Sequence, residues 1–159
     1  MAEIKMGLRT GKGHGREYPV AANQYFQRRG GHLVTLVDGA VTLSASKAAL
    51  RGDGLAGWAE VPKDSVATTG YWKSSSTAKE DKVFVITDMD AIYEMPYDGH
   101  TASLTASLIG RGCDLVCTPL STGLQKARIG KVASPIYIVD VDTDNLTVSV
   151  KIKASKKIA

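Results

Sequence analysis

Two pairs of apolar segments, each joined by a short turn, constrain the fold of this chain most. In the segment 32–46 (HLVTLVDGAVTLSAS), Asp38 and Gly39 stand between two apolar runs. Asp-Gly is favoured in two-residue type I′ hairpin turns, because both turn residues need a positive φ. In the segment 136–153 (IYIVDVDTDNLTVSVKIK), the turn DTDN separates two further apolar runs. The sequence therefore predicts two β-hairpins.

Alternation of apolar and polar residues predicts further β structure. The segment 101–108 (TASLTASL) alternates with a period of two, which is the period of a strand. The segment 82–88 (KVFVITD) contains a continuous apolar run, which predicts a strand covered on both faces. In the second arm of the second hairpin, the residues between the apolar positions are predicted to face outward. The residues predicted to face inward there are Leu146, Val148, Val150 and Ile152.

Helix signals are scarce by comparison. The segment 44–52 (SASKAALRG), with a serine N-cap and Gly52 at its end, predicts a helix of a turn or two. Several short strands separated by turns that contain Gly and Asp are typical of a sandwich or barrel. We therefore predict a mainly β fold, a small β-sandwich or barrel with an extended N-terminal arm and little helix. At 159 residues, one domain with a substantial core is expected.

Charge divides the chain into three parts. Residues 1–31 hold six basic and two acidic side chains (+4), residues 32–150 hold ten basic and fourteen acidic (−4), and residues 151–159 hold four basic and none acidic (+4). Residues 1–31 also contain six glycines and show no sustained period. We therefore predict an extended basic N-terminal arm over residues 1–31, a β domain over residues 32–153 and a basic tail over residues 154–159. Basic ends on an acidic body suit an acidic partner surface.

The glycine-rich stretch 7–18 (GLRTGKGHGREY) does not match a nucleotide-binding loop. A P-loop needs four residues between its glycines and a hydroxyl residue after its lysine. Here three residues separate Gly7 from Gly11, and Lys12 is followed by Gly13. A dinucleotide fingerprint also needs an apolar strand before its glycines, and none precedes them. We interpret the stretch as a flexible basic segment.

No motif predicts catalysis, a metal site or a cofactor. The stretch 140–145 (DVDTDN) imitates a calcium loop, but Asn145 and Lys151 stand where an EF-hand needs Gly and Glu. The acidic segment 88–99 has no nucleophile nearby that would complete an acid–base site. The three histidines are far apart and show no zinc spacing with the cysteines. We therefore predict that the chain is not an enzyme and holds no metal.

Cysteine spacing and the lack of long apolar runs bear on the compartment. On a strand, Cys113 and Cys117 would lie about 13 Å apart, whereas a disulfide needs Cα atoms within about 7 Å. Two buried thiols in a reducing compartment are expected. No apolar run approaches the roughly 20 residues of a membrane span, and we expect no secretory signal because the N-terminus lacks an apolar stretch.

Single-stranded nucleic acid is the alternative partner. Basic ends favour phosphate, and single-strand binders also need aromatic side chains on an exposed face beside the basic groups. Aromatic residues make up only 6% of the chain, and the best stacking candidate is Trp72 in the segment 70–73 (GYWK). A tryptophan at a strand edge more often covers the core. A small β-barrel that binds single-stranded nucleic acid is therefore the alternative hypothesis, and not the favoured one.

The order of these segments resembles the small β-rich head decoration, or cement, proteins of tailed bacteriophages. The resemblance rests on the placement of strands and turns from about residue 30 to residue 153. After the Gly- and basic-rich arm, the segments that carry it are GHLVTLVDGAVTL, GLAGWAEV, VFVITDMDAIYEMPYDG, TASLTASLIGRGCDLV, GLQKARIG and SPIYIVDVDTDNLTVSVKIK.

The resemblance implies a structural virion protein on the outer capsid surface, assembled in the cytoplasm of the host bacterium. Such a protein cements neighbouring major capsid subunits and stabilises the head. The resemblance also implies a homo-oligomer, with a trimer favoured and a dimer as the alternative. The basic arm is then expected to become ordered on the shell. The arm residues predicted to contact the capsid are Lys5, Arg9, Lys12, Arg16, Tyr18, Tyr25, Phe26, Arg28 and Arg29.

Overall fold

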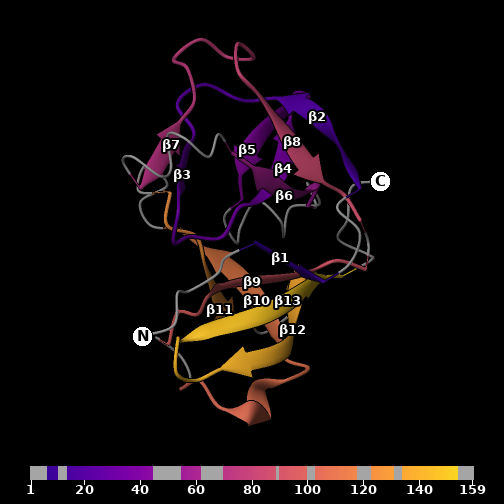
Figure 1. The fold of residues 1–159 in the computed structure, drawn as a ribbon, viewed down its shortest axis with the longest axis vertical. Helices are drawn as coiled ribbons and strands as arrows, with labels where there is room; N and C mark the ends of the chain where they lie inside the picture. The colour runs from indigo at the N-terminus through magenta and orange to yellow at the C-terminus, as the bar shows by residue number, and fades with distance from the viewer. Residues whose placement is uncertain are drawn as a thin grey trace.

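Two antiparallel sheets and a two-stranded ribbon make up the fold (Figure 1). The five-stranded sheet and the ribbon form one half of the molecule, and the six-stranded sheet forms the other. The structure, a computed structural model, describes residues 7–10, 14–44, 55–61, 70–88, 90–99, 103–117, 123–130 and 134–153.

The five-stranded sheet has the order β2-β8-β6-β4-β5. Its strands are β2 (Gly15–Pro19), β4 (Leu33–Val37), β5 (Ala40–Leu43), β6 (Gly57–Glu60) and β8 (Lys82–Ile86). Val20, directly after β2, forms a parallel bridge to Val41 of β5, and Ala21 N donates to the Val41 carbonyl at 3.0 Å. The two edges of this sheet therefore meet, and the sheet curls toward a small barrel.

The six-stranded sheet has the order β1-β9-β13-β12-β10-β11. Its strands are β1 (Gly7–Thr10), β9 (Ile92–Pro96), β10 (Gly112–Val116), β11 (Lys126–Ile129), β12 (Ile136–Asp142) and β13 (Thr147–Ile152). Tyr97, directly after β9, bridges in parallel to Ala127 of β11. This sheet therefore curls as well. Strand β1 pairs with residues 92–94, at the start of β9.

The ribbon consists of β3 (Tyr25–Gln27) and β7 (Tyr71–Lys73). Phe26 stands opposite Trp72 in its register, and both side chains are buried, with their ring centroids 5.9 Å apart. Because neighbouring residues of a strand point to opposite faces, the flanking residues of both strands face outward. The ribbon thus has an apolar inner face and a separate outer face.

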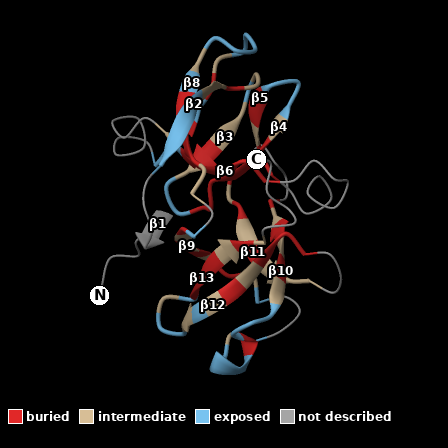
Figure 2. Cartoon of the chain, turned by 90° about the vertical axis from the view of Figure 1, so that its right-hand side faces the viewer, coloured by how far each residue is buried: buried red, intermediate tan, exposed pale blue. Residues whose placement is uncertain are grey.

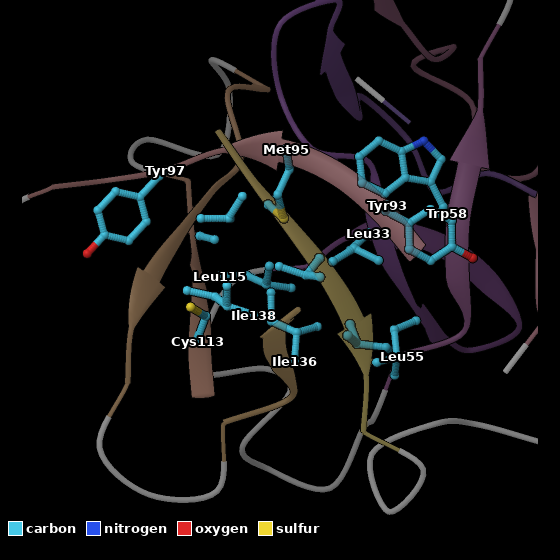
Figure 3. Packing of buried hydrophobic residues seen from close by; sticks show 14 of the residues in the cluster. Leu33, Leu55, Trp58, Tyr93, Met95, Tyr97, Cys113, Leu115, Ile136 and Ile138 are labelled. Atoms are coloured by element: carbon cyan, nitrogen blue, oxygen red, sulfur yellow. The ribbon is translucent and has the colours of Figure 1, made fainter. Parts of the chain in front are cut away.

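Buried residues lie along most strands, whereas the exposed ones gather at turns and along β2 (Figure 2). One hydrophobic cluster joins the two halves, because Leu33 and Trp58 of the five-stranded sheet pack with Tyr93 and Met95 of the six-stranded sheet (Figure 3). The rings of Trp58 and Tyr93 stack with centroids 5.1 Å apart and planes 8° apart. A second cluster, which includes Phe26 and Trp72, fills the five-stranded half.

The fold class and both hairpins are confirmed. The protein is mainly β, and the described residues contain one short 3₁₀ helix, η2 (Ala106–Leu108). Asp38 and Gly39 join β4 to β5 with φ values of 51° and 76°, as a type I′ turn requires. Strands β12 and β13 form the second hairpin.

The strand expected over residues 101–108 is wrong for its described part. Residues 103–105 belong to no strand, and η2 follows them. Leu104 is half-buried and Leu108 buried, whereas Ala106 is exposed. Leu108 belongs to the core cluster and Leu104 packs against it, so both leucines make their apolar contacts without a strand. The helix expected over residues 44–52 lies outside the described residues except for Ser44.

Two inferences about strand faces are also corrected. Leu146 has a φ of 57° in the turn before β13, and its side chain is exposed rather than inward. Thr147 and Ser149 were expected to face solvent but are buried, and the Thr147 hydroxyl donates to a Glu94 carboxylate oxygen at 2.6 Å. Strand β8 was expected to be covered on both faces. One of its faces is exposed, because Phe84 is exposed between buried neighbours.

The separate arm over residues 1–31 is not found in the described part of that segment. Strand β1 pairs with β9, β2 pairs with β8, and β3 pairs with β7, so these residues are built into the sheets. Val20 and Phe26 are fully buried, and this burial of apolar side chains explains why the segment joins the body. Residues 1–6, 11–13 and 154–159 lie outside the described residues. None of the described helices is long and apolar enough to cross a membrane.

Candidate functional site

The residues predicted to bind the capsid fall into separate places. Phe26 is a core residue, so it cannot contact a partner directly. Lys5 and Lys12 lie outside the described residues, and Arg9 lies in β1. The structure places the remaining five on two surfaces, β2 and the ribbon: Arg16, Tyr18, Tyr25, Arg28 and Arg29.

On β2, Arg16 and Tyr18 form a cation–π pair. The guanidinium carbon of Arg16 lies 5.2 Å from the ring centroid of Tyr18. The two residues are two positions apart on one strand and therefore share a face. Arg16 is exposed and Tyr18 is half-buried. The pair presents a positive charge beside an aromatic ring at one edge of the five-stranded sheet.

On the outer face of the ribbon, two tyrosines and a lysine pack together. The rings of Tyr25 and Tyr71 stack with centroids 5.6 Å apart and planes 30° apart. The Lys73 ammonium lies 5.4 Å from the Tyr25 ring centroid, and Lys73 is the cross-strand partner of Tyr25. A cation over a tyrosine face is attracted by the ring quadrupole. Tyr71 is 43% exposed.

Two arginines extend this surface. Arg28 and Arg29 follow β3 directly and are both exposed. The Arg28 N–H donates to the Gly70 carbonyl at 2.8 Å, which fixes this end of β3 beside the start of β7. We call the group Tyr25, Arg28, Arg29, Tyr71 and Lys73 the ribbon face. The segments that form it, 24–29 and 70–74, carry three basic and no acidic side chains.

Sequence reasoning found Tyr25, Arg28 and Arg29 but missed Tyr71 and Lys73. It identified the segment GYWK as the best stacking candidate, but gave more weight to a tryptophan that covers the core. Trp72 is buried in the core, at 9% exposure. Since Tyr71 and Lys73 flank Trp72 on a strand, they share the opposite face, and the alternation itself could have indicated them.

The acidic segment 88–99 does not gather into one site. Asp98 forms a 2.6 Å ion pair with Arg128, Glu94 accepts from Thr147, and Asp90 lies 3.7 Å from the Lys151 ammonium. Each of these carboxylates therefore has its own partner. Within the described ranges, no three His, Cys, Asp or Glu side chains converge as metal ligands.

The two cysteines are buried thiols, as expected. Neither Cys113 nor Cys117 forms a disulfide, and they pack in different hydrophobic clusters. Burial raises the pKa of Cys113 to about 12, and the neighbouring Asp114 carboxylate adds to the shift. Because the thiolate is the reactive form, this thiol is chemically inert in the folded protein.

His32 is buried within an aromatic cluster. Its ring lies 5.5 Å from Phe26, edge to face, and 5.4 Å from Trp58. Its Nε2 lies 2.9 Å from the Gln27 carbonyl oxygen, and its Nδ1 lies 3.2 Å from the Ala59 carbonyl oxygen. Burial lowers the pKa of His32 below the usual 6.5, although the two carbonyls act in the opposite direction. Burial therefore favours the neutral ring, which can donate to only one of the two carbonyls.

The free energy of unfolding is expected to fall as the pH drops below about 6.5, because the unfolded chain then binds a proton on His32 that the folded chain binds less readily. The decline continues until the pH passes the lowered pKa of the folded state. Urea unfolding measured between about pH 7.5 and about pH 5.5, above most carboxylate titrations, tests this. His32→Gln should flatten the slope in this window, whereas His14→Gln, at an exposed position, should keep it. An unchanged slope in His32→Gln would show that another group is responsible.

Comparison with known proteins identifies no relative. No protein-family model, no curated protein and no solved structure matches this chain. The functional argument therefore depends on the surfaces and charges of the molecule itself.

Proposed function

We propose that this protein is a structural virion protein that binds the outer face of a tailed-phage head and cements neighbouring major capsid subunits. The observation that carries the proposal is the charge distribution, with +4 on each basic end and −4 on the residues between. Opposite charges speed association and select partners. The basic N-terminal segment thus suits an acidic shell.

The fold supports this role because the described part of residues 1–31 reaches both halves. Strand β1 pairs with β9, and β2 pairs with β8. Arg16 is exposed on β2. A contact made by this segment is therefore anchored in both sheets. Many such contacts, repeated over a shell, strengthen one another through multivalency.

The test is co-sedimentation with undecorated heads assembled from the major capsid protein of the same phage. We expect saturable binding that weakens about tenfold or more in Lys5→Glu/Lys12→Glu, because rim charges set electrostatic attraction. The matched control is Lys156→Glu/Lys157→Glu, which makes the same change in net charge at the other end. Deleting residues 1–17 would be less informative, since it also removes β1 and part of β2.

Equal losses in both variants would show that net charge, not the N-terminal segment, guides binding. Single-stranded DNA serves as a parallel bait. Binding to DNA alone, weakening steeply as salt rises, would overturn the proposal in favour of the nucleic-acid alternative. Trp72 cannot serve as the stacking residue of the nucleic-acid alternative, since it lies in the core.

A further inference from the structure

The ribbon face combines the features of a protein-binding surface. Tyrosine and arginine are enriched among residues that dominate binding energy at interfaces. Here a stacked tyrosine pair lies beside Lys73, and the exposed Arg28 and Arg29 follow β3 directly. Phe26 and Trp72 support the pair from behind in the core. The face is thus rigid and positively charged, and Tyr71 gives it an exposed apolar area.

The turn between β12 and β13 has the complementary character. Asp144 lies in this turn and is exposed, and the end of β12 adds the exposed Asp140 and the half-buried Asp142. Leu146 follows at 61% exposure, above the other large hydrophobic side chains of the described residues. Three carboxylates thus precede one exposed leucine in this hairpin.

The acidic turn is fixed before any partner arrives. The Asp142 carboxylate accepts from the backbone N–H groups of Asp144 and Asn145, each at 3.1 Å, and from the Asn145 side-chain amide at 2.8 Å. The Leu146 carbonyl accepts from the Tyr97 N–H at 3.0 Å. A preformed loop loses little conformational entropy on binding.

We propose that the ribbon face binds a second copy of this chain by receiving its β12–β13 turn. Asp140 and Asp144 then meet the cations of the ribbon face, and Leu146 packs against Tyr71. The two surfaces lie in different halves of one molecule (Figure 1). Contact between two such unlike surfaces is head-to-tail, and repetition of it produces a ring or a filament. The contact needs no other protein, so it does not depend on head binding.

Sedimentation velocity of the purified full-length chain tests the proposal. We expect an oligomer at low salt that dissociates as salt screens the charges. The ribbon variant Arg28→Glu/Lys73→Glu and the turn variant Asp140→Lys/Asp144→Lys should each weaken self-association about tenfold or more, as loss of paired interfacial charges does. Asp142 is left intact because it holds the turn. The control variant Lys82→Glu/Arg111→Glu changes two exposed cations elsewhere and should associate like the wild type.

Mixing the two disrupted variants gives the decisive measurement. The ribbon variant keeps an intact turn, and the turn variant keeps an intact ribbon face. An equimolar mixture should therefore associate again, because the native contact forms between the two variants and the reversed charges of their altered surfaces also attract each other; this recovery also shows that both variants are folded. A wild-type chain that remains monomeric at low salt overturns the proposal, as does an oligomer that survives either variant. Single-stranded DNA binding that is lost in the ribbon variant, with no self-association, would assign the face to nucleic acid instead.

Discussion

Replacing Gln125 with leucine is expected to lower the free energy of unfolding by about 2–5 kcal/mol, although the volume of the side chain hardly changes. Gln125 is fully buried. Its Oε1 accepts from the Leu33 N–H at 2.9 Å, and its Nε2 donates to the carbonyls of Leu33 and Ser44 at 2.8 and 2.9 Å. Leucine leaves the Leu33 N–H and the Ser44 carbonyl facing methyl groups, whereas the Leu33 carbonyl keeps its bond from Ser44 N. Each unsatisfied buried group costs about 1–3 kcal/mol.

Gln24→Leu is the matched control for this loss. Gln24 also accepts from a backbone N–H, that of Leu43, at 3.0 Å, but it is half-buried. Water can replace its bonds, so a loss of about 0.5–1.5 kcal/mol is expected. Urea unfolding of both variants, with unchanged dependence on denaturant, measures the difference. Similar losses in the two variants would mean that burial of the amide partners of Gln125 is not the cause.

Gln125 also shows where sequence reasoning stops. The residue lies in the segment GLQKARIG, and nothing in its neighbours distinguishes it from an exposed polar side chain. Its partners are 92 and 81 positions away along the chain. It lies at the bridge that joins Gly31 to β11. Such a bond between the two halves depends on their packing, which no local pattern encodes.

The hairpins were predictable because their signals are local. A two-residue Asp-Gly turn requires positive φ at both positions, and few other sequences allow this. The alternation at 101–108 misled because small Ala, Ser and Thr residues contribute little burial on either face. Leu104 and Leu108 pack in or against the core cluster without forming a strand, so the alternation did not determine the structure there. Periodicity thus predicts structure only where its apolar members are large enough to matter.

The ribbon face was predictable in part for a similar reason. The basic residues Arg28 and Arg29 were identified from charge alone, and Tyr25 from its place among aromatic residues. Placing Tyr71 beside Tyr25 required the pairing of β3 with β7, whose residues stand about 45 positions apart. The described part of the first 31 residues is built into the sheets, with Val20 and Phe26 in the core, and the segment shows no sustained period that would have indicated these strands.

Replacing Gly57 with alanine is expected to destabilise the fold at least as strongly as the loss of Gln125. Gly57 begins β6 with a φ of 151°, a backbone region that side chains rarely adopt. A Cβ there would lie 1.8 Å from the Ile86 carbonyl oxygen and 3.2 Å from a Val85 methyl carbon. The backbone strain and the steric overlap each cost about 1–3 kcal/mol. Because Trp58, the next residue, pairs with Ile86 and stacks on Tyr93, the displacement would reach the shared core.

Gly39→Ala separates the two costs. Gly39 also has a positive φ, 76°, but a Cβ at this position meets no atom within 4 Å. The loss of unfolding free energy in Gly39→Ala should therefore come from backbone strain alone, about 1–3 kcal/mol. Thermal or urea unfolding of both variants gives the difference, which should be a loss of about 1–3 kcal/mol more for Gly57→Ala. If Gly39→Ala proves as destabilising as Gly57→Ala, then strand β8 does not approach β6 closely enough at this point to exclude a side chain. The pairing of β6 with β8 would then tolerate a wider spacing, and the shared core around Trp58 would be less tightly determined by it.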